Sequence, residues 1–271
     1  MIPKSNLHTH TRFCDGKDSA EEVVLAAIAA GMETVGFSGH SGLPFSTSWT
    51  MKQERTREYQ KEILRLKDAY RDQIHILLGI EQDYLTGVPD YPYEYVIGSV
   101  HCIEVDGEHF MIDESAQVLT DAAKKYYGGD FYKLCRAYYE YVAKVIDRTH
   151  GDIVGHFDLV TKFNEGGCMF DESDPRYLRY AIDALDALLE KDVIFEINTG
   201  AMSRGYRRSP YPSPLLLRRI AEKGGNVTST ADAHAKENLQ YAFSDAVLLA
   251  RAAGLGSVLT MTRDGWKRLP L

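Results

Sequence analysis

The sequence has few cysteines and no long hydrophobic segment, and both absences limit what the protein can be. None of its four cysteines, Cys14, Cys102, Cys135 and Cys168, belongs to a CxxC pair. A disulfide framework and a thiolate zinc site are therefore disfavoured, and a reduced protein is indicated. The longest apolar run, residues 23–32, is too short to cross a bilayer, and the first residues lack the apolar stretch of a signal peptide. We expect a cytoplasmic protein without a membrane partner.

The sequence also lacks a block of positive charge. Its net charge is −8, and a chain without clustered Lys and Arg is a poor partner for a nucleic-acid backbone. Neither GxGxxG nor GxxxxGKS/T follows any strand-like run, so the usual nucleotide-binding loops are missing too. A small phosphate ester remains compatible with this charge, because bound metal cations can reverse the local field.

What the sequence does contain is an alternation of β-rich runs with longer helical stretches. No repeat or linker interrupts the 271 residues, so we predict one domain over residues 1–271. Helix starts are marked by a capping box at Ser19 and by Asp174 and Ser213, each followed by a proline. The pattern predicts an α/β fold with a mostly parallel sheet, either a closed barrel or an open doubly wound sheet. The β-rich runs are residues 4–8, 34–38, 75–81, 95–100, 152–156, 193–198, 226–231 and, less regularly, 257–261.

Imidazole and carboxylate side chains gather at the ends of these runs. In parallel β/α folds the carboxyl ends of the strands are where functional side chains meet. Three other histidines, His75, His109 and His150, lie elsewhere and are interpreted as structural or surface residues. The residues that gather at strand ends or in the loop after the first run are His8, His10, Asp15, His40, Glu81, His101, His156, Asp232 and His234.

Two pairs within this set share one spacing. His8 and His10 end the first run, and Asp232 and His234 follow the seventh. Residues i and i+2 of a strand point to the same face, so each pair can reach one ion. If the sheet closes into a barrel, the first and last strands become neighbours and the two pairs meet. An open sheet gives no such reason, and we therefore favour the barrel.

A metal site is the simplest explanation for so many clustered donors. Without cations they would repel one another or be poorly solvated. Nitrogen and oxygen donors without thiolate suit zinc, iron, manganese or cobalt. Cys14 and Cys102 each lie near one of the donors in sequence, and we interpret them as supporting residues rather than nucleophiles.

The segments HTHTRFCDG, GFSGHS, GIEQDY, GSVH, GHFDL, EINTG and ADAH together resemble the polymerase and histidinol phosphatase (PHP) family, in its histidinol-phosphatase branch. The resemblance extends from residue 7 to residue 234. It implies a distorted seven-stranded, TIM-like β/α barrel with two or three divalent metal ions. Asn6 and Ala231 stand where the family often has Asp and Ser, but neither is a ligand. By this resemblance the first ion is held by His8, His10, Glu81 and Asp232, the second by Glu81, His101 and His156, and the third by Asp15, His40 and His234.

The resemblance also implies a hydrolase that acts on a small phosphomonoester. In this branch the enzyme is a histidinol-phosphatase of histidine biosynthesis, which converts L-histidinol phosphate and water to L-histidinol and phosphate. A metal-bridging hydroxide held by the same ligands would attack phosphorus. Residues 42–51 and 106–113 are candidate lids from their position. The candidate substrate contacts are Lys162, Arg204 and Arg207 for phosphate, Asp83 and Glu104 for the positive charges of histidinol, and Ser41 for a hydroxyl contact.

Three alternatives stay open. The same chemistry could act on another small phosphoester, such as a nucleotide, a phosphotyrosine peptide or an oligonucleotide end. A metal-binding regulator without catalysis is disfavoured because every expected ligand position is filled. An amidohydrolase also begins with HxH on a barrel strand, but it would usually need a bridging lysine from a strand, and here the third run ends in Glu81. The sequence does not predict the oligomeric state.

Overall fold

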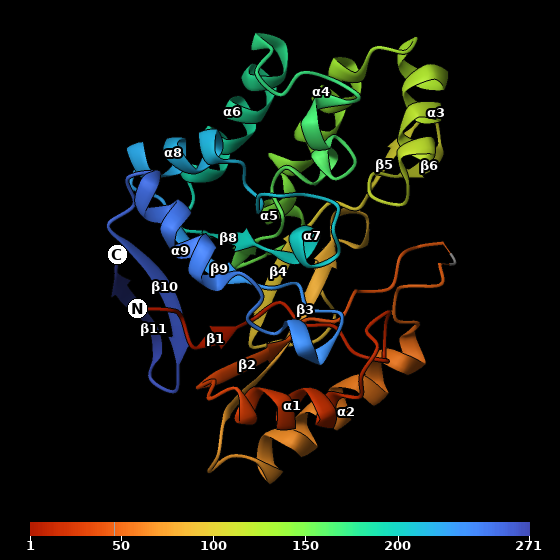
Figure 1. The fold of residues 1–271 in the computed structure, drawn as a ribbon. Coiled ribbons are helices and arrows are strands. Elements are labelled where there is room, and N and C mark those ends of the chain that lie inside the picture. Colours follow the sequence, from red (N-terminus) through yellow and green to blue (C-terminus); the bar gives the residue numbers. More distant parts are fainter. Residues whose placement is uncertain (46) are drawn as a thin grey trace.

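The centre of the protein is a parallel sheet that curls around the site of the predicted metal ligands (Figure 1). A computed structural model describes residues 1–45 and 47–271. Every predicted β-rich run contains a strand, whereas β5, β6 and β11 were not predicted. The main sheet has the order β1 (Ser5–Asn6), β2 (Thr34–Phe37), β3 (His75–Asp83), β4 (Tyr95–Ser99), β7 (Ile153–Val154), β8 (Ile194–Asn198), β9 (Asn226–Thr230), β10 (Ser257–Thr262) and β11 (Gly265–Pro270). A separate antiparallel hairpin consists of β5 (Cys102–Val105) and β6 (Glu108–Met111).

The expected count of seven strands is wrong, because the main sheet has nine. Neighbours from β1 to β10 are parallel, and β11 is antiparallel to β10. The sheet nevertheless curls far enough for its first strand to reach β9. Beyond the ends of β1 and β9, Thr9 pairs with Ala233 in a parallel bridge. The backbone N–H of His10 donates to the carbonyl of Ala233 over 2.9 Å, and the N–H of Ala233 donates to His8 over 3.0 Å. This junction brings together the two pairs that the sequence placed at opposite ends of the chain.

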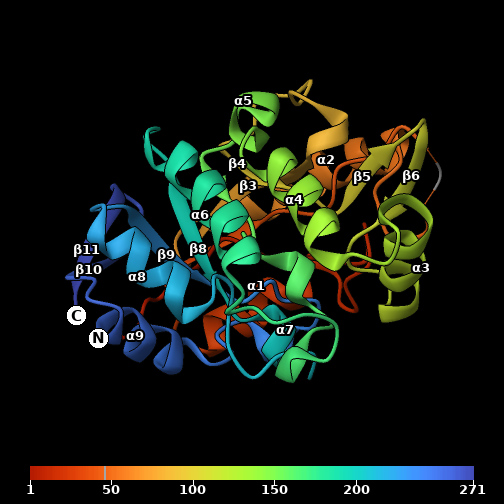
Figure 2. The ribbon, with the colours of Figure 1, turned by 90° about the horizontal axis from the view of Figure 1, so that it is seen from above.

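Most helices lie outside the curled sheet, as the view from above shows (Figure 2), whereas the helix Ala116–Tyr127 packs against β6 and the helix Phe131–Val142. Their starts follow the predicted signals in part. Ser19 forms the full capping box with Glu22, and the Asp174 carboxylate accepts from the N–H of Arg176. Ser213 precedes a helix-starting proline but its side chain makes no capping hydrogen bond. The helices are α1 (Ala20–Ala29), α2 (Gln53–Ala69), α3 (Ala116–Tyr127), α4 (Phe131–Val142), α5 (Val145–Thr149), α6 (Pro175–Leu189), α7 (Gly200–Ser203), α8 (Pro214–Glu222) and α9 (Phe243–Ala252).

The side chain of Tyr95 lies in the interior of the curled sheet, in a cluster with Leu7, Leu77, Ile97 and Ile153. Its hydroxyl donates to the carbonyl of Leu7 over 2.6 Å. A Cβ atom at Gly36 or at Gly79 would lie within 2.4 Å of the Tyr95 side chain, so both strands need glycine where the ring passes. Glycine at these two positions therefore makes room for an aromatic ring.

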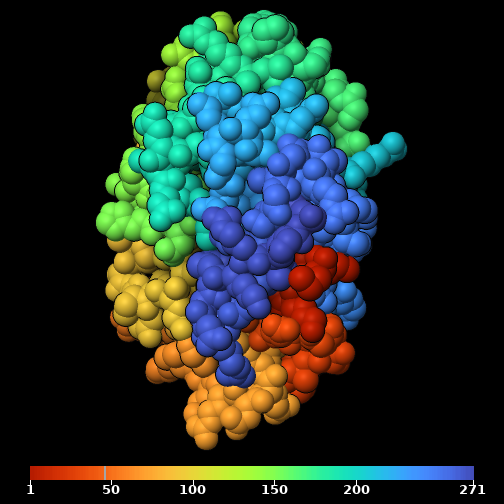
Figure 3. Space-filling model, turned by 90° about the vertical axis from the view of Figure 1, so that its left-hand side faces the viewer, coloured from red at the N-terminus to blue at the C-terminus, as the bar shows by residue number. Residues whose placement is uncertain are grey.

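The two ends of the chain meet on one face of the molecule. In Figure 3 the C-terminal hairpin β10–β11 lies against the N-terminal segment. The hydroxyl groups of Ser5 and Thr260 are 2.8 Å apart, and the N–H of Met261 donates to Ser5 over 3.0 Å. Across residues 1–45 and 47–271, no helix has the length and apolar character needed to cross a membrane.

Candidate metal centre

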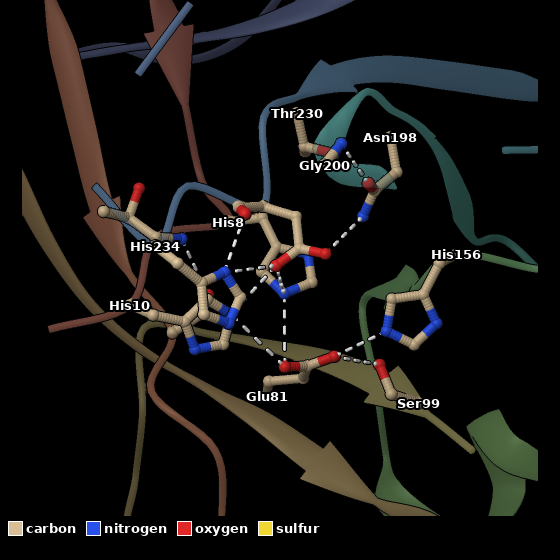
Figure 4. Close-up of polar contacts among 12 residues, drawn as sticks. His8, His10, Glu81, Ser99, His156, Asn198, Gly200, Thr230 and His234 are labelled. Atoms are coloured by element: carbon tan, nitrogen blue, oxygen red, sulfur yellow. Dashed lines mark hydrogen bonds and ion pairs between the residues drawn. The ribbon is translucent and has the colours of Figure 1, made fainter. Parts of the chain in front are cut away.

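Glu81 lies at the middle of the predicted donor cluster, within β3 and almost fully buried (Figure 4). One carboxylate oxygen, Oε2, faces His8 Nε2 at 3.2 Å and His10 Nε2 at 3.6 Å. The other, Oε1, faces His101 Nε2 at 3.2 Å and His156 Nε2 at 2.9 Å. The side chain therefore presents one oxygen to each of two pairs of imidazoles, as a bridging ligand would.

Asp232 completes the first group of donors. Its Oδ1 atom lies 3.7 Å from His8 Nε2 and 3.2 Å from His10 Nε2. Ligand atoms about 2.1 Å from one tetrahedral ion are about 3.4 Å apart, which matches these separations. His8 Nε2, His10 Nε2 and Glu81 Oε2 are buried and have no hydrogen-bond partner among the described residues. Buried nitrogen and oxygen atoms that lack hydrogen-bond partners and face one another at this spacing fit the ligand shell of a divalent cation.

A further group surrounds Asp15. Its carboxylate lies 3.6 Å from His40 Nε2 and 3.2 Å from His234 Nε2. His10 joins this group, because its Nδ1 is 3.7 Å from Asp15 and its ring stacks on His234 at 4.1 Å. His40 also reaches Glu81, with Nδ1 2.8 Å from Oε2. Eight of the nine predicted ligands form groups that share members, and His156 joins them through Glu81, so all nine converge on one region.

The protonation states of Glu81 and His10 suit metal binding, whereas His8 and His101 must release a proton to a cation. Burial alone would lower the pKa of these two imidazoles, but the surrounding carboxylates raise it. Burial alone would raise the pKa of Glu81, but His8, His40 and His101 hold it well below its usual value, so the carboxylate is charged. Burial and the neighbouring His234 and His40 lower the pKa of His10 to about 3, so its imidazole is neutral near pH 7. Charged carboxylates and neutral imidazoles are the forms that bind cations.

A second carboxylate, Glu196 in β8, orients two of the donors and was missed by the sequence analysis. Its Oε2 atom lies 2.8 Å from His8 Nδ1, and its Oε1 accepts from the backbone N–H of His156. The pKa of Glu196 is lowered: burial raises it, but His8 more than offsets this. An ionised Glu196 accepts the proton of Nδ1 and leaves the lone pair of His8 Nε2 free for a metal. A charged residue inside the apolar run 193–198 was the available signal.

The cluster opens into a cavity of about 570 Å³, and both candidate lids contribute to its wall. Trp49, from residues 42–51, packs edge-on to His40 with ring centroids 4.6 Å apart. Phe45 contacts His109 of the hairpin at 4.6 Å, so the two segments meet. His109 therefore lies beside the cavity wall and is not an isolated surface residue. Lys162, Arg204 and the unpredicted Asp113, Glu114 and Tyr206 also line the cavity.

Only two of the predicted substrate contacts reach this cavity, Lys162 and Arg204. Asp83 is buried behind His101, with its Oδ2 3.2 Å from His101 Nδ1. The Ser41 hydroxyl is within 3.2 Å of Thr86 and accepts from the N–H of Asp83.

The other two predicted contacts are engaged outside the cavity. Arg207 points away from it and pairs with Glu172. Glu104 is exposed on the hairpin, 3.3 Å from His109. Sequence distance from a ligand predicted these positions, but strand direction and loop path turn their side chains away.

The fold and the donor set define a class of protein, the β/α proteins that hold metal ions at the carboxyl ends of a curled parallel sheet. Comparison with known proteins makes this more specific: the chain belongs to the PHP domain family, whose model matches residues 6–200.

Among similar proteins, one from Deinococcus radiodurans named "Probable histidinol-phosphatase" is 28% identical, over 91% of this chain and 92% of that protein. The chain also resembles two crystal structures. A histidinol phosphatase candidate from Listeria monocytogenes has a TM-score of 0.77 at 24% identity, covering 89% of this chain and 99% of that one. The histidinol phosphate phosphatase from Lactococcus lactis, complexed with zinc, L-histidinol and phosphate, has a TM-score of 0.71 at 21% identity, covering 98% of this chain and all of that one.

Proposed function

We propose that the protein is a metal-dependent phosphomonoesterase, and specifically a histidinol-phosphatase that hydrolyses L-histidinol phosphate to L-histidinol and phosphate. The observation that carries this proposal is the cavity itself, in which Lys162 and Arg204 lie beside the cluster of metal donors. The names of the similar proteins and the ligands of the Lactococcus lactis structure support the same substrate. Residues 1–271 act as a single domain in this proposal.

The donors hold two or three divalent ions, of zinc, iron or manganese. Such ions would supply Lewis-acid charge for the phosphate oxygens and lower the pKa of the attacking water. Glu81 would serve two of the ions, because its two oxygens face different imidazoles. The assignment follows the family: His8, His10, Glu81 and Asp232 for the first ion, Glu81, His101 and His156 for the second, and Asp15, His40 and His234 for the third.

Lys162 and Arg204 bind the phosphate group from the open side of the cluster. Lys162 is held in place by Asp113, whose carbonyl and Oδ2 atom lie 2.8 and 3.1 Å from Nζ. Arg204 donates to Asp232 Oδ2 over 3.0 Å, which fixes its guanidinium beside the donors. Trp49 covers His40 and excludes water from that side.

The leaving group of histidinol phosphate carries an ammonium and an imidazole, and the cavity offers acidic partners. Asp113 and Glu114 line it and replace Asp83 and Glu104 as the candidates for this contact. Burial alone would raise the pKa of Asp113, but Lys162, His101 and His156 lower it, so the carboxylate is charged. A negative wall favours a cationic leaving group over the uncharged nucleoside that a nucleotide would release.

The test combines metal removal with a panel of substrates. The metal-replete protein should hydrolyse histidinol phosphate faster than nucleotides or phosphotyrosine, and chelator-stripped protein should lose the activity and regain it with zinc or manganese. Asp113→Asn should lower kcat/KM for histidinol phosphate more than for an aryl phosphate, whose leaving group carries no positive charge. Full activity without detectable metal would exclude the mechanism. Bound metal without hydrolysis of any phosphoester would favour a regulator.

A further inference from the structure

One buried arginine joins the two loops that carry the cationic side chains of the cavity. Residues 158–172 follow β7 and include Lys162, and residues 199–213 follow β8 and include Arg204. Arg207 comes three residues after Arg204, and only 8% of its side chain is exposed. Its Nη1 donates to the carbonyl of Thr161, the residue before Lys162, over 2.9 Å. Arg207 therefore links the backbone next to one cation with the segment that carries the other.

The same guanidinium also forms a bidentate ion pair with Glu172. Nη1 lies 2.8 Å from Oε1 and Nη2 lies 3.1 Å from Oε2. Glu172 Oε1 further accepts from the side-chain amide of Asn164, whose Oδ1 accepts from the N–H of Phe170. Arg207 thus binds a loop that is stabilised by its own hydrogen bonds. The planar guanidinium fixes the orientation of the Glu172 carboxylate, because it forms two parallel hydrogen bonds with it.

Few other polar interactions connect the two loops. The Asp158 carboxylate accepts from the N–H of Ser213 over 2.9 Å, and the N–H of Arg208 donates to Glu165 over 3.1 Å. Apart from short helical turns the loops have no regular structure, so side-chain contacts set their relative position. Tyr206 adds an aromatic contact between the loops, with Lys162 Nζ 5.0 Å from its ring and Phe163 edge-on to it at 5.5 Å. Among the hydrogen bonds between the loops, that of Arg207 to Thr161 lies nearest in sequence to both Lys162 and Arg204.

We propose that Arg207 is a positioning residue that sets the separation between Lys162 and Arg204, and through it the affinity of the cavity for a phosphate group. The proposal rests on the proposed function, because it takes these two cations as the phosphate contacts. Arg207 itself touches no substrate. A displacement of about 1 Å in a positioned group can cost about 100-fold in rate. If the contact between residues 158–172 and 199–213 is weakened, phosphate binding should therefore weaken measurably.

The experiment compares Arg207→Ala, Arg207→Lys and Glu172→Gln with a matched control, Arg208→Ala. Arg208 is the neighbouring arginine, and 92% of its side chain is exposed. Binding of inorganic phosphate to the metal-replete proteins is measured by calorimetry, and KM and kcat are measured with an aryl phosphate. Hydrogen exchange of the amides in residues 158–172 and 204–213 gives a readout that does not depend on activity.

Arg207→Ala should weaken phosphate binding and raise KM by about 10-fold, with a smaller change in kcat. Amide exchange should become faster in both loops. Arg207→Lys and Glu172→Gln keep part of the network and should fall between Ala and wild type, so they also serve if the Ala variant does not fold. Arg208→Ala should match wild type in every measurement.

The proposal is overturned if folded variants at positions 207 and 172 bind phosphate and exchange their amides as wild type does. Faster amide exchange in only one loop would also overturn it, because the loss of a contact between two loops should increase the mobility of both. If the wild type fails to hydrolyse histidinol phosphate, the proposed substrate is wrong. Phosphate binding and amide exchange still decide the role of Arg207 in that case.

Discussion

Replacing Glu196 with glutamine should disrupt metal binding although Glu196 is not itself a predicted ligand. Four donors converge on its two oxygens. His8 Nδ1 and the Thr230 hydroxyl lie 2.8 Å from Oε2, while the N–H of His156 and the Asn198 amide lie 2.5 and 2.7 Å from Oε1. Glutamine offers one carbonyl oxygen and one NH₂ group. One orientation of the amide sets its NH₂ against the N–H donors of His156 and Asn198, and the other requires His8 Nδ1 and the Thr230 hydroxyl to accept.

Both orientations of that glutamine are unfavourable. With its nitrogen toward His156, it opposes a backbone N–H, and an unpaired buried donor costs about 1–3 kcal/mol. With its nitrogen toward His8, the Nδ1 atom must accept, and the imidazole proton moves to Nε2, the atom that faces Glu81. Loss of such an outer partner typically lowers metal affinity by about 10–100-fold, or about 1.4–2.8 kcal/mol.

The assay equilibrates Glu196→Gln with a series of buffered free zinc concentrations and measures the bound metal per chain. Urea unfolding of the metal-free protein measures the separate loss of stability. Glu190→Gln is the matched control, because Glu190 is an exposed residue at the end of α6. Wild-type zinc affinity in Glu196→Gln would refute the reasoning, since it would mean that His8 binds no ion or needs no orienting partner.

Two other predictions concern residues around the site. Burial raises the pKa of Asp158 to about 7. The native state therefore retains a proton that the unfolded chain releases above about pH 4. The free energy of unfolding should fall as the pH rises from 4 to 7. Asp158→Asn cannot ionise and should gain about 2 kcal/mol relative to wild type between pH 5 and pH 8 in denaturant unfolding; parallel pH profiles would contradict this. Trp49 is one of two tryptophans, and its ring centroid lies 4.6 Å from that of His40. Zinc binding should therefore change the tryptophan fluorescence of wild type but not of Trp49→Phe. An equal change in both proteins would place the ion elsewhere.

Most of the donors could be placed from the sequence because the carboxyl ends of parallel strands share one edge of the sheet. Asp15, in a loop, and Asp232, with φ 45°, do not follow strand periodicity. His8 and His10 needed only the alternation of a strand, and their meeting with Asp232 needed only a curled sheet. The number of strands was harder to predict. The hairpin strand β11 extends the sheet beyond β10 and carries no functional residue, so no motif marked it.

The substrate contacts could not be predicted in the same way, because they come from loops. Asp83 lies two residues from Glu81, yet in an extended strand it reaches His101 and not the cavity. Lys162 is in the cavity because a short helical turn and Asp113 direct it there. Asp113 ends the candidate lid of residues 106–113, but nothing in its local sequence indicated that its carboxylate holds Lys162. Periodicity describes strands, whereas loop side chains depend on contacts with distant segments.

The junction between Thr9 and Ala233 has a consequence for how the protein matures. The first donors to leave the ribosome, His8 and His10, meet Asp232 only after more than four-fifths of the chain has been synthesised. If these residues share an ion, as proposed, a nascent chain can carry at most part of its coordination shell. The complete shell would form only when β9 docks beside β1.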